Sequence, residues 1–361
     1  MEVTRFRGPV REPVSLGQVR AAMLTGPRRI EIVEVAEPEL VPGSCVVAVE
    51  RCGIGGPDLV AWSTGELVAP AWFGHEWAGR VVAVGADAGE RFVGERVVGA
   101  VPPPCGRCAP CRAGIDTTCR LVMSMILGTD ELADSHGAFA ERIRVDARRV
   151  HRLPEGVDFA DGSLAEPGAV AAHAVRRARP SLGDIVVVVG AGAVGLLVAE
   201  LARLSGAGRV AVLEREADRR ELACRLGADA AFGSPEDLLR WLSGQGHGLG
   251  ADVVFECAGG QDAVDAGTEA GRTGGTLVLV GTAPDGALLR ASTLVAREMT
   301  VSASLGYTVA DVHRALHLMA DDRFRVSELH GPAIGFAELA STFEGLSRRP
   351  GSRPKVLFQP R

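Results

Sequence analysis

Four cysteines lie close together in the sequence with a spacing that suits metal binding. Cys105, Cys108, Cys111 and Cys119 follow the pattern C-x2-C-x2-C-x7-C. Four thiolates on one short loop can surround a Zn²⁺ ion tetrahedrally and leave no position for a substrate, which is typical of a structural zinc site. An iron–sulfur cluster is the alternative, but its fourth cysteine usually follows after three residues and precedes a proline. The spacing therefore predicts one structural zinc ion per chain.

A glycine-rich turn provides the second chemical signal. It follows a run of five β-branched residues, 185–189, which suits a strand buried in a parallel sheet. The first glycine of the turn allows a tight bend, the second lets the backbone approach a pyrophosphate, and the third lets helix and strand pack closely. The helix that begins here offers unpaired N–H groups to the phosphates. The residues expected to hold the dinucleotide are Gly190, Gly192, Ala193, Val194 and Gly195.

The choice between NAD and NADP depends on the end of the next predicted strand, residues 210–214. Glu214 ends that strand, and an acid at this position accepts hydrogen bonds from the adenosine ribose diol and repels a 2′-phosphate. Arg215 and Arg219 lie nearby in the sequence and could pair with such a phosphate. We therefore predict an NAD site, with NADP as the less favoured cofactor.

Two kinds of supporting structure must position these groups. Residues 19–160 contain short strand-like runs between Gly and Pro turns, which predicts a β-rich, barrel-like unit. Strands and helices alternate after it, and residues 251–257 and 275–281 predict further parallel strands. Ligands bind beyond the carboxyl ends of such strands. The residues expected beside the nicotinamide are Cys257, Val280 and Gly281.

Composition restricts the kind of partner. The chain has 361 residues and a net charge of −6, which predicts two domains and no general attraction to nucleic acid or anionic membranes. It has no signal-peptide core and no run of 18 apolar residues. We expect a cytoplasmic protein that binds a small-molecule substrate, and we read residues 1–18 as an N-terminal extension without an assigned function.

Several motifs, taken in order, resemble those of the medium-chain zinc-dependent alcohol dehydrogenase family. They are Gly74-His75-Glu76-x-x-Gly79, the four-cysteine loop, residues 137–141, Glu166-Pro167, the dinucleotide turn and residues 223–229. The resemblance implies an α/β protein with a GroES-like catalytic domain, residues 19–167 and 305–361, and a doubly wound Rossmann cofactor domain, residues 168–304. It also implies a homodimer or homotetramer, and it places Lys355 near the cofactor pyrophosphate.

The sequence departs from this family where a catalytic zinc would bind. Relatives usually carry C-G-x-C-G-[ST]-D-x-H, in which the second Cys binds zinc and the hydroxyl and the His relay the substrate proton. Gly55, Pro57 and Val60 occupy these three positions here. We therefore expect no tightly held catalytic zinc, because the site has lost a soft anionic ligand.

Part of the catalytic site is nevertheless retained. The resemblance implies that His75, Glu76 and Glu166 are possible metal ligands and that Asp58 orients His75. Three protein ligands plus an open position would just suffice for a catalytic zinc. The alternative is that His75 is a buried histidine satisfied by Asp58 and that Glu166 is a carboxylate at the start of a helix.

These features favour an NAD(P)-dependent dehydrogenase or reductase that acts on a small alcohol or ketone. The loss of the zinc ligand and of both relay groups leaves two alternatives open. One is a zinc-independent double-bond reductase or a redox-neutral enzyme with bound NAD, and the other is a non-catalytic NAD-binding protein. Tyr307, the one tyrosine of the chain, could replace the missing proton donor.

Overall fold

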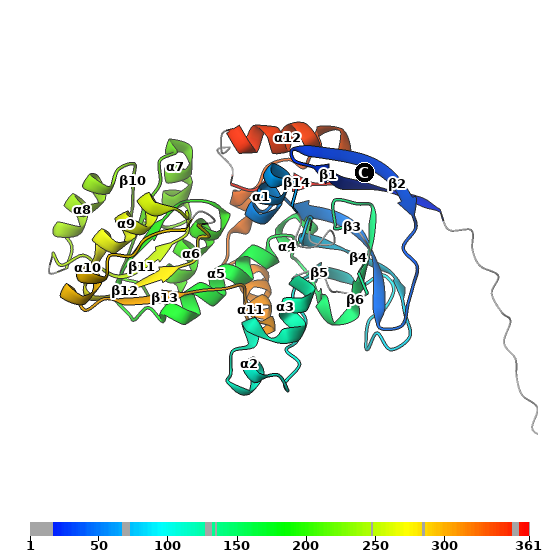
Figure 1. Cartoon of the computed structure of the whole chain (residues 1–361), viewed down its shortest axis with the longest axis horizontal. Coiled ribbons are helices and arrows are strands. Elements are labelled where there is room, and N and C mark those ends of the chain that lie inside the picture. Colours follow the sequence, from blue (N-terminus) through cyan, green and yellow to red (C-terminus); the bar gives the residue numbers. More distant parts are fainter. Residues whose placement is uncertain are drawn as a thin grey trace, which may run out of the picture.

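The structure is a computed structural model that describes residues 17–66, 73–126, 132–133, 136–246, 248–283, 286–348 and 354–360. The N-terminal extension predicted over residues 1–18 lies outside the described residues except for its last two positions. Figure 1 shows two lobes, one built on an antiparallel sheet and the other on a parallel sheet.

Short strands with buried apolar side chains form the antiparallel lobe. β3 is its central strand, because it pairs with β4, β6 and β14. The pairing with β14 brings the C-terminal end of the chain back to this lobe, next to Cys52 and Gly53. The strands are β3 (Ser44–Gly53), β4 (Glu76–Val84), β5 (Arg96–Gly99), β6 (Arg142–Asp146), β7 (Val150–Arg152) and β14 (Leu357–Phe358).

A two-stranded hairpin and several helices cover this sheet. The hairpin lies beside α12, whose Phe336 and Phe343 are buried in the core of the lobe (Figure 1). The pieces are β1 (Gln18–Gly26), β2 (Arg29–Ala36), α1 (Gly56–Thr64), η3 (Ala147–Arg149), α4 (Phe159–Gly162), η4 (Val326–Leu329) and α12 (Phe336–Arg348).

The second lobe contains a six-stranded parallel sheet in the order β10-β9-β8-β11-β12-β13. The strand order reverses between β8 and β11, which is where doubly wound folds bind their ligands. The strands are β8 (Ile185–Val189), β9 (Arg209–Leu213), β10 (Ala230–Phe232), β11 (Ala251–Glu256), β12 (Gly271–Leu279) and β13 (Thr300–Ala303). The helices are α6 (Ala193–Leu204), α7 (Ala217–Arg225), α8 (Pro235–Ser243), α9 (Gln261–Ala270) and α10 (Ala291–Ala296). The strands predicted from the sequence in this lobe are confirmed, with bounds that differ by a few residues.

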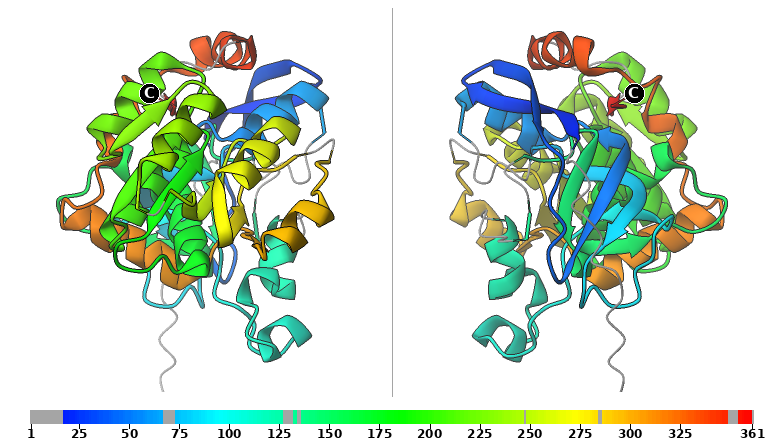
Figure 2. Two further views of the ribbon diagram at one scale, coloured as in Figure 1. Left: turned by 90° about the vertical axis from the view of Figure 1, so that its left-hand side faces the viewer. Right: turned by 90° about the vertical axis from the view of Figure 1, so that its right-hand side faces the viewer.

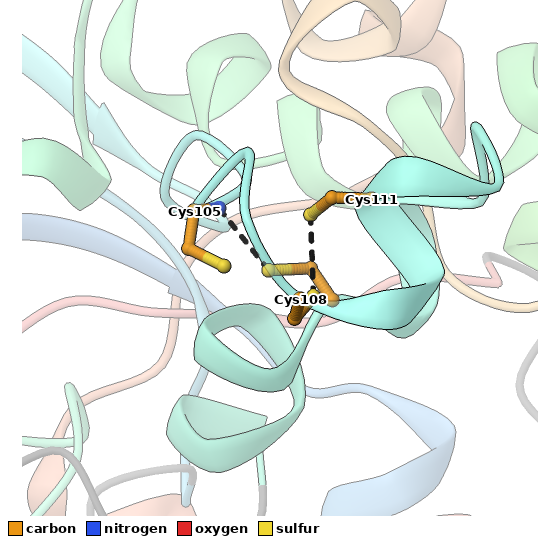
Figure 3. Close-up of side chains that lie close together, drawn as sticks. Cys105, Cys108 and Cys111 are labelled. Carbon is orange, nitrogen blue, oxygen red and sulfur yellow. Dashed lines mark hydrogen bonds between the residues drawn. The ribbon is translucent and has the colours of Figure 1, made fainter.

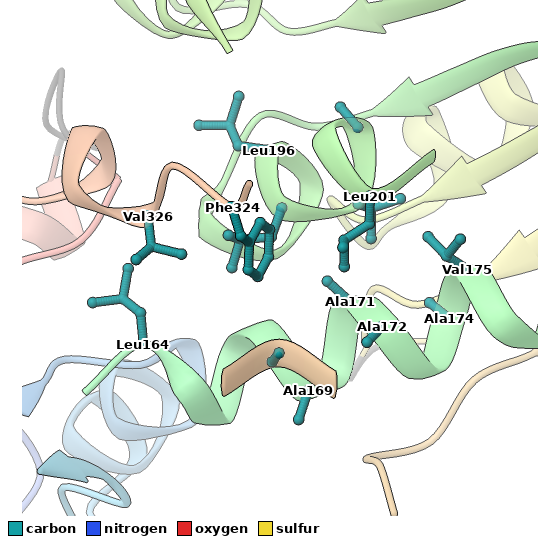
Figure 4. Close-up of a cluster of buried hydrophobic side chains, with 14 of the residues drawn as sticks. Leu164, Ala169, Ala171, Ala172, Ala174, Val175, Leu196, Leu201, Phe324 and Val326 are labelled. Atoms are coloured by element: carbon teal, nitrogen blue, oxygen red, sulfur yellow. The ribbon is translucent and has the colours of Figure 1, made fainter. Parts of the chain in front are cut away.

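Two helices connect the lobes, α5 (Ala165–Ala178) and α11 (Val309–Ala320). Gly168 allows them to pack closely, because a Cβ there would lie 3.1 Å from Phe324 and 3.3 Å from Ala315. Figure 4 shows Phe324 among the apolar side chains of α5 and α6. The first turn of α5, which carries Glu166, is thus fixed against the cofactor lobe.

A small excursion carries the four cysteines and projects from the body of the molecule (Figure 2). It contains α2 (Ala109–Arg112), η2 (Asp116–Thr118) and α3 (Arg120–Ile126). Among the described residues, no helix combines the length and the apolar character that a membrane crossing requires.

Candidate functional site

The four cysteines predicted to bind zinc converge on one point. Their sulfur atoms all lie within 4.8 Å of one another. The Cys105 N–H donates to Cys119 Sγ over 3.2 Å, and the sulfur atoms of Cys108 and Cys111 are 3.4 Å apart (Figure 3). Four converging thiolates fit a tetrahedral zinc ion with no place for a substrate. A zinc ion here would cross-link the excursion and have a structural role.

The glycine-rich turn joins β8 to α6, as predicted. Gly190 has φ +96°, a left-handed conformation that favours glycine. A Cβ on Gly195 would collide with the Gly190 carbonyl oxygen, so this glycine is required for the packing of the turn. A Cβ on Gly192 would have no atom within 4 Å. The side of the turn that would face a pyrophosphate is therefore open, and Ala193 and Val194 begin the helix beside it.

A cavity of about 790 Å³ lies beside this turn and is lined by Gly190, Glu214 and Arg215. The carboxylate of Glu214 accepts hydrogen bonds from the Ala191 N–H at 2.7 Å and the Glu216 N–H at 2.9 Å. It is thus fixed at the mouth of the turn. Four further acids line the cavity, namely Glu236, Asp262, Asp265 and Glu269. Arg219 lies on α7 and is not one of the described lining residues.

The carboxyl ends of β11 and β12 form the neighbouring edge. The Cys257 N–H donates to the Val189 carbonyl oxygen, and the N–H groups of Val280 and Gly281 donate to that of Glu256, each over 2.8 Å. Burial raises the pKa of the Cys257 thiol. The Cys257 thiol therefore stays neutral, and we infer that the residue acts at this edge through its backbone hydrogen bond and its packing.

Glu256 organises the turn that follows β11, a role that the sequence analysis missed. Its buried carboxylate accepts hydrogen bonds from the Ala258 N–H at 2.7 Å and the Gly259 N–H at 2.6 Å. These two residues line the cavity. An acidic residue at the end of an apolar strand, next to a glycine pair, was the available sequence signal.

The residues predicted for catalysis form a buried cluster between the two lobes. Ligand atoms of His75, Glu76 and Glu166 all lie within 4.8 Å of one another. His75 and Glu76 stand at the start of β4, whereas Glu166 lies in the first turn of α5. The structure therefore brings Glu166 next to the adjacent pair His75 and Glu76, from which it is distant in the sequence.

Asp58 lies next to His75, as the resemblance implied. Its Oδ1 is 3.6 Å from His75 Nδ1, and its two oxygens accept the Gly55 N–H at 2.7 Å and the Gly74 N–H at 2.8 Å. Burial alone would lower the pKa of His75, but the Asp58 carboxylate and two further acids outweigh it and raise the pKa from 6.5 to about 9. His75 therefore favours the protonated form, and a metal ion would have to displace this proton in order to bind.

Burial raises the pKa of Glu166 from 4.5 to about 7, against the opposing effect of His75. A carboxyl group with a pKa near neutrality can both donate and accept a proton at physiological pH. Acid–base chemistry is therefore open to this cluster.

Lys355 lies in this cluster, a position that the sequence analysis did not foresee. Its Nζ atom lies 2.7 and 2.5 Å from the two carboxylate oxygens of Glu76, and its place near the cofactor pyrophosphate stays a prediction. It also donates to the Ile54 carbonyl oxygen at 3.2 Å, and the lysine is buried. The cause is the pairing of β14 with β3, which draws this segment across Gly53.

The space for a side chain at position 55 is filled by the neighbouring residues. A Cβ on Gly55 would lie 2.9 Å from Glu76 Oε1 and 3.1 Å from His75 Cε1. The Glu76 carboxylate therefore crowds the space that a side chain at position 55 would need, and both of its oxygens bind Lys355. Without Glu76, only His75 and Glu166 remain, one fewer than the three protein ligands of a catalytic zinc. The absence of a tightly held catalytic zinc ion stays a prediction, which the ion pair between Glu76 and Lys355 supports.

Comparisons with known proteins agree with this architecture. Two family profiles match: "Alcohol dehydrogenase GroES-like domain" over residues 41–155 and "Zinc-binding dehydrogenase" over residues 193–321. A probable D-xylulose reductase A from Arthroderma otae is 31% identical over 356 residues, which cover 96% of this chain and 98% of the relative. The (R,R)-butanediol dehydrogenase from Bacillus subtilis strain 168 is 30% identical, with 95% of this chain and 100% of the relative covered.

A solved structure extends the comparison to a bound cofactor. A protein from Sinorhizobium meliloti 1021, solved bound to NADP, has a TM-score of 0.83 and 30% identity, and the match covers 95% of this chain and 100% of that chain. The predicted fold class, a GroES-like β-rich domain with a doubly wound Rossmann domain, is confirmed.

Proposed function

Because the chain belongs to the medium-chain zinc-dependent alcohol dehydrogenase family and is thus an NAD(P)-dependent oxidoreductase, we propose that it interconverts a small alcohol and its ketone without a catalytic zinc ion. The observation that carries this proposal is the buried ion pair between Lys355 and Glu76. A catalytic zinc would need Glu76 as its third protein ligand. The ammonium group of Lys355 already compensates the negative charge of the Glu76 carboxylate.

The four-cysteine loop supports a different role for zinc. We propose that Cys105, Cys108, Cys111 and Cys119 hold one structural zinc ion, because their sulfur atoms converge and leave no open position. The protein would then contain one zinc ion per chain, remote from the reaction.

We propose NAD as the preferred cofactor. The cavity at the Gly190 turn is lined by Glu214 and four further acids, whereas Arg215 is the one basic residue among the described lining residues. A 2′-phosphate would be repelled by this concentration of negative charge. Titration of cofactor binding by fluorescence tests this: NADH should bind at least about tenfold more tightly than NADPH, a difference of ~1.4 kcal/mol. Equal affinities would contradict the proposal.

The chemistry needs little beyond cofactor, substrate and a proton source. A bound nicotinamide would supply or accept the hydride. Glu166 has a pKa of about 7, which suits a group that exchanges a proton near physiological pH. The protonated His75, held by Asp58, would stabilise negative charge that develops on the substrate oxygen. These groups would together replace the Lewis acid of the relatives.

The names of the relatives guide the choice of substrates. A xylulose reductase and a butanediol dehydrogenase both act on small molecules with neighbouring oxygen groups. We therefore propose a small hydroxy-ketone or diol as the substrate class. The earlier expectations of a homodimer or homotetramer and of a cytoplasmic location stay predictions.

The experiment is a nicotinamide absorbance assay with acetoin, xylulose and a conjugated enone offered separately. We expect NADH oxidation with the hydroxy-ketones acetoin and xylulose, in protein that contains one zinc ion per chain. Oxidation of NADH with the enone alone would favour the double-bond reductase. Conversion of substrate without a net change in nicotinamide absorbance would favour a redox-neutral enzyme.

A further inference from the structure

Tyr307 lies in the segment that joins β13, an edge strand of the parallel sheet, to α11. The parallel register aligns the ends of neighbouring strands, since Glu256 pairs with Leu279 and Leu279 pairs with Ala303. The segment therefore leaves the sheet at the edge where the nicotinamide side was predicted. Figure 1 shows it returning from β13 towards the antiparallel lobe.

The hydroxyl of Tyr307 is buried without a hydrogen-bond partner among the described residues. The residue is only 4% exposed. A buried hydroxyl that makes no hydrogen bond costs folding free energy, and native proteins retain such groups mainly where a ligand or a water molecule satisfies them. The structure thus contains a hydrogen-bond donor that lacks an acceptor.

This donor lies beside the catalytic cluster. The Glu166 carboxyl is close enough to the Tyr307 hydroxyl to raise the pKa of Tyr307 through charge and a hydrogen-bonding contact, although the two groups do not meet the distance and angle of a well-formed hydrogen bond. Burial, followed by the charge of Glu166, raises the pKa of Tyr307 well above its usual value, with Arg149 acting in the opposite direction. Tyr307 is therefore a neutral phenol that carries its proton.

A buried network fixes the backbone immediately after Tyr307. Asp311 in the first turn of α11 accepts hydrogen bonds from Thr308 N at 3.0 Å, from His173 Nδ1 at 2.9 Å and from Arg176 Nε at 2.9 Å. His173 and Arg176 lie on α5, the helix that carries Glu166. The network thus ties the segment of Tyr307 to the helix of Glu166, and we regard Asp311 as a positioning residue.

We propose that Tyr307 is a catalytic residue whose hydroxyl donates the proton to the substrate oxygen during ketone reduction. This inference rests on the proposed function. The carbonyl carbon gains the hydride of the reduced nicotinamide, and the carbonyl oxygen gains the Tyr307 proton. One proton taken up from the solvent then restores the phenol, so that the overall reaction consumes the ketone, the reduced nicotinamide and one proton. Oxidation of the alcohol follows the same steps in reverse.

The test is the Tyr307→Phe variant of the full chain, which removes only the hydroxyl. We expect kcat for ketone reduction to fall by at least about 100-fold, as for loss of a general acid. We expect the affinity for NADH and the melting temperature to be unchanged or higher, because an unsatisfied hydroxyl has gone. A purely structural hydroxyl would give a lower melting temperature instead.

A matched control removes another buried hydroxyl. Thr268 donates to the Val264 carbonyl oxygen at 2.7 Å within α9, so Thr268→Val should lower the melting temperature and leave kcat unchanged. Because Tyr307 is the only tyrosine, ultraviolet resonance Raman of its ring reports its hydrogen bonding directly. We expect no donated bond in the NAD⁺ complex and a donated bond after a ketone is added.

The possible failures are distinguishable. A wild type that turns over none of the alcohols or ketones would overturn the proposed function together with this inference. A wild type that turns over ketone, with Tyr307→Phe within about threefold of its kcat, would overturn the inference alone. A Raman spectrum of Tyr307 that does not change when ketone binds would also overturn the inference alone.

Discussion

The Nζ atom of Lys355 lies 2.5 and 2.7 Å from the two carboxylate oxygens of Glu76, and both side chains are buried. These residues are far apart in the sequence and meet because β14 pairs with β3. A buried carboxylate needs a compensating charge, which either a metal ion or an ammonium group can supply. In this chain the ammonium group supplies it, and this relationship underlies the predictions that follow.

Removal of Lys355 should make the site receptive to metal. In Lys355→Met the Glu76 carboxylate loses its partner. We expect the free energy of unfolding of the protein, with zinc bound only at the four cysteines, to fall by about 3–5 kcal/mol. Added zinc should then bind near Glu76, raise the melting temperature and bring the metal content from one to two per chain. The Lys355→Arg variant keeps the positive charge and should still contain one zinc ion per chain. A Lys355→Met protein that takes up no second ion would show that the ion pair does not limit metal binding.

A cysteine at position 55 should be insufficient by itself. Its Cβ would lie 2.9 Å from Glu76 Oε1, so the Glu76 carboxylate must shift, and the cysteine competes with the ion pair to Lys355 for this space. We expect Gly55→Cys to bind a second zinc ion at least about tenfold more weakly than the double variant with Lys355→Met. Calorimetric titration with zinc measures both. Equal affinities of the single and double variants would contradict this coupling.

A side chain at Gly192 should block the cofactor and leave the fold intact. Gly192 has φ −67° and ψ 178°, which other residues adopt readily, and a Cβ there would have no neighbour within 4 Å. Gly192→Val should therefore keep the melting temperature within ~2 °C of wild type and lower NADH affinity at least about tenfold. Gly195→Val is the contrasting variant, because its Cβ would collide with Gly190 and should destabilise the protein. Normal NADH affinity in Gly192→Val would place the pyrophosphate elsewhere.

His75 should make the protein less stable as the pH rises. Its pKa is about 9 in the folded state and 6.5 ordinarily, so its contribution is fully present below pH 6.5 and is lost by about pH 9. The contribution is at most about 3 kcal/mol. The melting temperature of wild type relative to His75→Gln should therefore fall between pH 7 and 9, and most clearly between pH 8 and 9, where Glu166, with a pKa of about 7, is already largely ionised. A constant difference across that range would show that His75 is not protonated by its neighbours.

Much of the fold and the cofactor turn could be predicted because local sequence determines them. The run of residues 185–189, followed by spaced glycines, specifies a strand, a turn and a helix without knowledge of the rest of the chain. The four-cysteine loop is equally local. The position of Lys355 could not be predicted in this way, since it depends on the register of a two-residue strand that pairs across the whole chain.

The same distinction applies to the catalytic cluster. Motif order alone identified His75, Glu76 and Glu166. That Glu76 fills the space beside Gly55 depends on side-chain packing between segments, which spacing does not reveal. Glu256 was missed for a similar reason, because its backbone partners are determined by the tertiary fold of the turn that follows it.

The most direct measurement is the zinc content of wild-type protein, purified from zinc-supplemented cells and dialysed against zinc-free buffer, with NADH-dependent ketone reduction measured on the same sample. We predict one zinc ion per chain, bound by the four cysteines, together with full activity. Two ions per chain, with activity lost when a chelator removes the second, would contradict the account.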